Sequence, residues 1–162
     1  MIIGLVVASL KAFLIWPSWL AIEFSQNKLT IISIALDNLR QIFELHINDN
    51  RLSGSIPKAI THLKKLGTLD LSKNNLIGTI PKAITHLKNL EILYLSSNNL
   101  IGTIPRGVGK LHSLQVLFLD SNKLSGSIPD SIYRLVSLSS LDISKNNLEG
   151  PIPNGIGNCS SM

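Results

Sequence analysis

The chain has 162 residues, of which 44% are hydrophobic, 15% are charged and 5% are aromatic. Leucine alone occurs 28 times, which excludes an intrinsically disordered chain, because disordered chains are poor in aliphatic residues and rich in charge. The single cysteine excludes an internal disulfide framework. The net charge of +5 comes without a basic run or interleaved aromatic residues, so no nucleic-acid partner is expected.

Residues 1–38 are expected to hold degenerate repeat remnants, although a signal-like segment or a wrongly assigned start also fits them. Residues 2–8 resemble the apolar part of a signal peptide, but no Lys or Arg precedes them. A membrane-spanning helix would be interrupted by Lys11 and Pro17. Six positions match a weakened form of the pattern that follows: Trp16, Trp19, Ile22, Phe24, Asn27 and Leu29.

Residues 39–158 are five repeats of 24 residues. Equivalent positions of the repeats form columns, and one column is leucine at every 24th residue: Leu39, Leu63, Leu87, Leu111 and Leu135. An asparagine column follows in step: Asn50, Asn74, Asn98, Asn122 and Asn146. A glycine column comes next: Gly54, Gly78, Gly102, Gly126 and Gly150. A fixed period of this length is typical of stacked repeat proteins, in which no single unit can bury its own apolar side chains.

Each repeat predicts one short strand followed by a tight return. Leu69 and Leu71 alternate with a polar residue, so both leucines should face the interior and the stacked strands should form a parallel sheet. The asparagine column is expected to be buried at the turn and to bond to backbone groups of its own and the neighbouring turn. The glycine column indicates an unusual backbone conformation or a close approach. Residues 82–86 are expected to return as a short helical or 3₁₀ turn.

The repeat pattern LxxLxxLxLxxNxLxGxIP, which is intact from Leu87 to Pro105, resembles the plant-type extracellular subclass of leucine-rich repeat. The resemblance implies an α/β solenoid, a curved array with a parallel concave β-sheet and short helical or 3₁₀ returns on the convex side. It further implies a fragment of the ectodomain of a receptor-like protein or receptor-like kinase, at the plasma membrane or in the apoplast. Such a module would bind a peptide or protein ligand and act with a co-receptor kinase in defence or developmental signalling.

Residues 159–162 are expected to begin a truncated sixth repeat, with Cys159 in place of a leucine. Members of the family usually carry cysteine-paired caps, and none stands here, so the chain resembles a piece of a longer ectodomain. The triplet Asn158-Cys159-Ser160 fits the N-glycosylation sequon, which makes Asn158 a candidate glycan site.

No catalytic motif is found, since the chain has no Walker loop, no GxSxG and no HExxH. The chain is therefore not expected to be an enzyme, and no cofactor or metal is expected. His62 and His86 share a column, and their simplest interpretation is a pair of solvated surface side chains.

The outward-facing strand positions are strongly acidic. They hold two of the fifteen bases and seven of the ten acids, which gives this face a formal charge of −5: Glu23, Glu44, Asp49, Asp70, Glu91, Asp120 and Asp142 against Lys73 and Lys145. The candidate ligand surface consists of an apolar block and its polar surroundings: Tyr94, Phe118, Ile92 and Val116, with Glu91, Asp70, Asp120, Asp142 and His46. Aromatic anchors within an acidic field favour a basic peptide over an acidic oligosaccharide.

Other interpretations stay open at this stage. Asp70 and Asp142 occupy a position that is usually Asp in the family, so they could be scaffold, and the apolar block could be lateral packing between strands. The alternative functions are a secreted protein similar to polygalacturonase inhibitors, an intracellular scaffold, or a non-functional receptor gene fragment.

Overall fold

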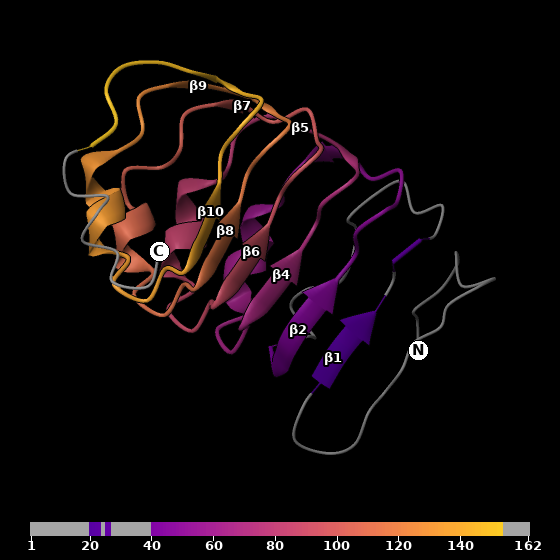
Figure 1. Cartoon of the computed structure of the whole chain (residues 1–162). Coiled ribbons are helices and arrows are strands. Elements are labelled where there is room, and N and C mark those ends of the chain that lie inside the picture. The colour runs from indigo at the N-terminus through magenta and orange to yellow at the C-terminus, as the bar shows by residue number, and fades with distance from the viewer. Residues whose placement is uncertain (1–19, 24, 27–39, 154–162) are drawn as a thin grey trace.

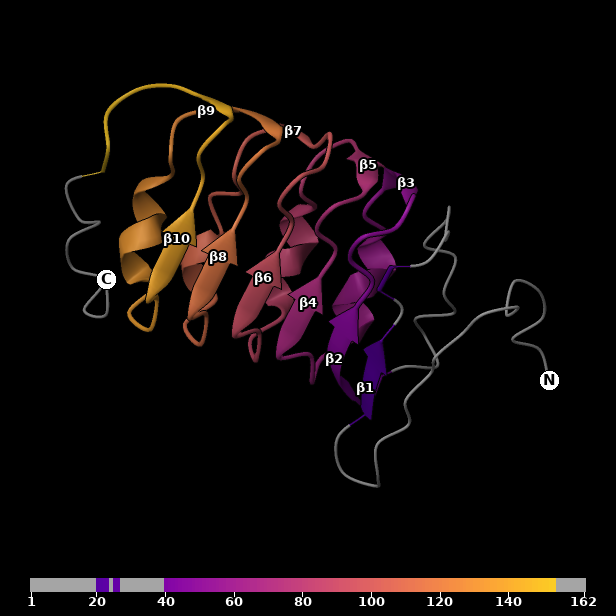
Figure 2. The same ribbon diagram turned by 45° about the vertical axis from the view of Figure 1, so that its right-hand side comes forward.

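The structure, a computed structural model, describes residues 20–23, 25–26 and 40–153. Six strands lie in chain order in one parallel sheet: β1 (Leu20–Glu23), β2 (Ile42–His46), β4 (Thr68–Asp70), β6 (Ile92–Tyr94), β8 (Val116–Phe118) and β10 (Ser140–Asp142). Short 3₁₀ helices line the other side of the coil, as Figures 1 and 2 show from two directions. The predicted solenoid is confirmed.

The strands of the large sheet pair in the register that the repeat predicts. Leu69 lies opposite Leu93, which in turn lies opposite Leu117, and all three leucines are buried. Because side chains alternate between the two faces of a strand, the residues on either side of each leucine project from the outer surface of the sheet. The repeat thus stacks equivalent residues in columns across that surface.

β1 extends the sheet by one strand beyond the regular repeats. Ile22 lies opposite Leu45, at a separation one residue shorter than the period, and the register shifts between Leu20 and Ala21. Residues 1–19 and 27–39 lie outside the described part, and with them lie the predictions of a signal-like segment and of further repeat remnants. Among the described residues, no helix is both long enough and apolar enough to cross a membrane.

The expectation of one strand per repeat is wrong, because a second extended segment in each repeat also pairs. These strands form two small parallel sheets: β3 (Ser53–Ser55) with β5 (Asn75–Ile77), and β7 (Ile101–Gly102) with β9 (Lys123–Gly126) and β11 (Asn147–Leu148). The physical reason is the close stacking of the coils. The Ile101 amide, for example, donates to the Gly78 carbonyl across 2.8 Å. These second segments have no alternating apolar pattern in the sequence, and they form strands by pairing with the equivalent segments of adjacent repeats.

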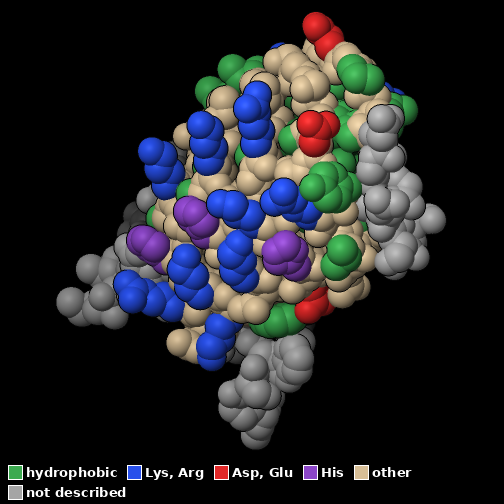
Figure 3. All heavy atoms as spheres, turned by 90° about the vertical axis from the view of Figure 1, so that its left-hand side faces the viewer, with side chains coloured by type: hydrophobic (Ala, Val, Ile, Leu, Met, Phe, Trp, Pro, Cys, Tyr) green, Lys and Arg blue, Asp and Glu red, His purple; other side chains and the backbone are tan. Residues whose placement is uncertain are grey.

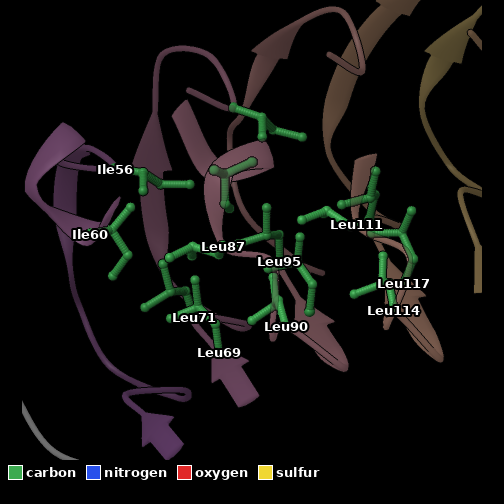
Figure 4. Close-up of a cluster of buried hydrophobic side chains, with 14 of the residues drawn as sticks. Ile56, Ile60, Leu69, Leu71, Leu87, Leu90, Leu95, Leu111, Leu114 and Leu117 are labelled. Carbon is green, nitrogen blue, oxygen red and sulfur yellow. The ribbon is translucent and has the colours of Figure 1, made fainter. Parts of the chain in front are cut away.

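The returns are 3₁₀ helices, as expected: η2 (Lys58–His62), η3 (Lys82–His86), η4 (Val108–Lys110) and η5 (Asp130–Arg134). Each contributes a buried aliphatic residue, such as Ile60 or Ile84, to the space behind the sheet. Figure 4 shows side chains from the strands and the returns meeting in one continuous core. Leucine and isoleucine fill nearly all of this core, which explains why the chain needs so few aromatic residues.

The asparagine column forms the predicted ladder at the end of each strand. The amide nitrogen of Asn98 donates to the carbonyls of Leu95 and Ser96 in its own turn and of Leu71 in the preceding repeat, at 3.0–3.3 Å. Its oxygen accepts a bond of 3.0 Å from the Leu76 amide. One side chain therefore closes its own turn and fastens it to the preceding coil.

Candidate functional site

The concave sheet brings the predicted apolar block together. The rings of Tyr94 and Phe118 lie side by side, with centroids 5.2 Å apart and planes inclined by 46°. Ile92 lies opposite Val116 on the same two strands. All four side chains are half-buried. They form a continuous apolar platform on β6 and β8 that keeps part of its surface in solvent.

A third aromatic side chain, Phe43, contributes to the same face and was not singled out from the sequence. Its ring covers Gly67 of the next repeat so closely that a Cβ on Gly67 would lie 2.5 Å from Cζ of the ring. A glycine directly before a strand, one repeat after an aromatic residue at the same position of the repeat, was the signal for this contact. Phe43 therefore packs against the backbone at Gly67, directly before β4 begins.

Two of the predicted acidic residues are held by the turns that follow their strands. Oδ1 of Asp70 accepts bonds from the amide and the hydroxyl of Ser72, at 2.9 and 2.7 Å. Oδ1 of Asp142 accepts a 2.9 Å bond from the Ser144 amide, and this backbone bond lowers the pKa of the Asp142 carboxyl. Both carboxylates thus stabilise the turns at the ends of their strands.

The other predicted polar residues pair with neighbouring side chains. Asp120 accepts bonds from the hydroxyls of Ser96 and Ser121, the latter across 3.1 Å.

Glu91 meets the Gln115 amide at 3.4 Å, and His46 lies 3.4 Å from a Glu44 oxygen on the same strand. The Glu44 side chain is 43% exposed and the His46 side chain 27%. Glu91 and Glu44 are therefore free of the turn bonds that bind Asp70 and Asp142 into the scaffold.

Four of the seven acidic residues counted from the sequence lie within strands of the large sheet: Glu23, Glu44, Asp70 and Asp142. In the register of the strands, Glu44 lies opposite Thr68, which lies opposite Ile92. His46 likewise lies opposite Asp70, which lies opposite Tyr94. Among the described residues, no cluster of three or more His, Cys, Asp or Glu side chains is arranged to hold a metal ion. The candidate glycan site at Asn158 lies outside the described residues.

The stacked coils, the asparagine ladder and the concave parallel sheet define a leucine-rich repeat solenoid. The family model described as leucine rich repeat matches residues 44–100 and 97–148. The chain belongs to the leucine-rich repeat family. No curated protein sequence matches it significantly.

Several solved structures of plant receptors are similar to the chain. The plant peptide hormone receptor RGFR1, in complex with RGF2, is 39% identical with a TM-score of 0.83, and the match covers 87% of this chain. The Arabidopsis receptor kinase HAESA, in complex with the peptide hormone IDA and the co-receptor SERK1, is 36% identical over 85% of this chain, with a TM-score of 0.74. The chain spans 23% of the length of each of these two relatives.

A shorter relative is matched over most of its length. The leucine-rich repeat ectodomain of the Arabidopsis thaliana receptor kinase SOBIR1 is 36% identical with a TM-score of 0.75. The match covers 82% of this chain and 72% of that ectodomain. The three relatives are thus plant receptors or receptor ectodomains, and two of them are bound to peptides.

Proposed function

We propose that the chain is a non-enzymatic ligand-binding segment of a plant cell-surface receptor ectodomain, on the extracellular side of the plasma membrane or in the apoplast. The observation that carries the proposal is the apolar platform of Tyr94 and Phe118 within an acidic sheet. The relatives that bind peptide hormones support it. Its partners would be a peptide ligand and a co-receptor kinase, in defence or developmental signalling.

The chemistry of the face selects the class of peptide. Half-buried aromatic rings offer apolar area that is rigid and cheap to desolvate, which is why such residues dominate binding energy at interfaces. Seven acids against two bases on this face attract a cation and repel an acidic ligand. The favoured ligand is a peptide with Lys or Arg next to an apolar residue. It would bind across β6 and β8, in contact with the apolar platform that includes Ile92 and Val116.

The first experiment separates the aromatic platform from the rest of the surface. A library of basic and acidic peptides is screened against the full chain, and the best ligand is titrated against Phe118→Ala. We expect the affinity to fall at least about 30-fold, corresponding to about 2 kcal/mol. Tyr133→Ala is the matched control, because Tyr133 is an exposed aromatic residue on η5, away from the concave sheet. Equal affinities of the two variants would contradict the assignment.

The second experiment tests the charge without breaking a turn. Glu91 has no turn bond, so Glu91→Gln removes one carboxylate from the face and leaves the scaffold intact. We expect slower association at low salt and a difference that shrinks as salt is added. Asp130→Asn, on the outer side at η5, should leave the association rate unchanged. Preferred binding of acidic peptides would show that the electrostatic part of the proposal is wrong.

A further inference from the structure

The outer side of the solenoid, opposite the acidic sheet, is strongly basic. The four return segments 57–66, 81–90, 105–114 and 129–138 hold eight Lys and Arg residues and one acid, Asp130. Figure 3 shows these cations in rows across the face formed by the returns, with histidines among them. No described carboxylate lies within ion-pair distance of Lys82, Arg106 or Lys110. The positive charge of this side is therefore not neutralised locally.

A groove of about 590 Å³ opens on this basic side, between η3 and η4. Four basic side chains line it in two columns and two repeats, Lys82 and His86 from one return and Arg106 and Lys110 from the next. The hydroxyl-bearing residues Thr79 and Thr103 also line it. The groove thus offers cations and hydroxyl groups to the same ligand.

The repeat departs from its pattern at the groove. Gly107 and Gly109 stand where the preceding return has Ala83 and Thr85, and η4 is three residues long where η3 has five. A Cβ on Gly107 would lie 3.0 Å from the Thr85 hydroxyl, so the glycine lets the two returns approach closely where both residues line the groove. The hollow and the cations belong to the same pair of repeats.

We infer that this groove binds a linear acidic polysaccharide through its carboxylates. The two basic columns continue into Lys58 of the preceding repeat and Arg134 of the following one, so a polymer with regularly repeated carboxylates can meet cations along the stack.

The lining favours a glycan over other polyanions. Among the residues that line the groove the imidazole of His86 is the single aromatic ring, whereas single-stranded nucleic acids are bound on a series of aromatic rings that stack on successive bases. The exposed lining offers no deep apolar pocket for a peptide side chain, whereas Thr79, Thr103 and the ammonium and guanidinium groups can bond to sugar hydroxyls and carboxylates. The glycan would occupy the side opposite the concave sheet, so it would not compete with a peptide.

The test uses a fluorescently labelled, fully de-esterified α-1,4-linked oligogalacturonide and the full chain, with affinity measured by anisotropy. We expect the triple variant Lys82→Gln, Arg106→Gln and Lys110→Gln to bind about tenfold more weakly or worse. The matched control is a triple variant that removes the same charge elsewhere, at three exposed positions away from the groove: Arg51→Gln, Lys123→Gln and Lys145→Gln. We expect the control to change the affinity less than about threefold.

Three further arms decide the ligand class. The methyl-esterified oligogalacturonide should bind far more weakly, because its carboxylates are uncharged. Ala83→Gln, which places a neutral side chain in the groove, should weaken binding without changing the charge. A single-stranded oligodeoxynucleotide and a polyglutamate peptide of equal charge should bind more weakly than the glycan. Equal losses in the two triple variants, or tighter binding of either competitor, would overturn the inference.

Discussion

Asn98→Ala should destabilise the solenoid far more than Asn99→Ala, although the two positions are adjacent and chemically identical. Asn98 is 8% exposed and its amide makes four hydrogen bonds of 3.0–3.3 Å, two of which reach the preceding repeat. Asn99 is half-buried, and the bond that it contributes, from its backbone amide to the Leu76 carbonyl, survives the substitution. The difference in stability between the two variants therefore measures the contribution of the Asn98 side-chain amide.

The magnitude follows from what the substitution leaves behind. Alanine at 98 orphans the buried Leu76 amide and removes the donor that serves the Leu71 and Leu95 carbonyls. A buried group without a partner costs about 1–3 kcal/mol, and the loss of several partial bonds brings the expected total to about 2–4 kcal/mol. Asn99→Ala should cost at most about 0.5 kcal/mol, as surface substitutions do.

The assay is equilibrium unfolding in urea, with an unchanged slope showing that only stability has changed. Asn146→Ala supplies a graded control. Asn146 makes the same set of bonds, at 2.9–3.1 Å, but lies half-buried near the end of the described array, so water can replace part of what is lost. We expect its loss of stability to lie between those of the other two variants. Equal urea midpoints for Asn98→Ala and Asn99→Ala would refute the reasoning.

Two further predictions concern single positions. Gly102→Ala should destabilise more than Gly54→Ala: both have positive φ, 77° and 81°, which costs an L residue about 1 kcal/mol, but only at Gly102 does a new Cβ meet a neighbour, Thr79 Cγ2 at 2.9 Å. Equal midpoints in urea would show that this contact costs nothing. The Asp142 carboxyl should titrate below its ordinary pKa in NMR, because the Ser144 amide stabilises the charged form, so its small contribution to stability is present above the unfolded-state pKa and is lost as pH falls through the folded one. An ordinary or raised pKa in the folded chain would contradict this bond.

The strands and returns could be predicted because their residues carry local signals. Leu69 and Leu71 alternate, and the return at η3 was predicted at Lys82–His86, where it is found. The left-handed residue before each ladder asparagine carries no such signal. Asp49 and Lys73, with φ of 53° and 52°, have nothing in common chemically, so their conformation is imposed by the turn.

The parts of the candidate site that could not be predicted depend on contacts between repeats. The overlap of Phe43 with Gly67 and the pairing of the second strands are properties of stacking, which a single repeat does not encode. The repeat itself assigns most of the bases to the returns, but it does not predict the groove between η3 and η4. Lys82 and Arg106 are 24 residues apart, so the sequence shows no basic run, and only the closed coil brings their columns together.

The 24-residue repeat places acidic and basic side chains on different faces of the solenoid, and the overall composition does not show this separation. A net charge of +5 is compatible with a concave face of −5 and a set of returns of +7, because each position of the repeat projects from a fixed side of the stack. Substitution in one column changes one face and leaves the core leucines untouched, so each face is free to acquire its own ligand. The screening length at physiological salt is about 8 Å, similar to the thickness of one packed layer. Each field therefore acts mainly on ligands that approach its own side, and the two faces can have opposite charge at little electrostatic cost to the fold.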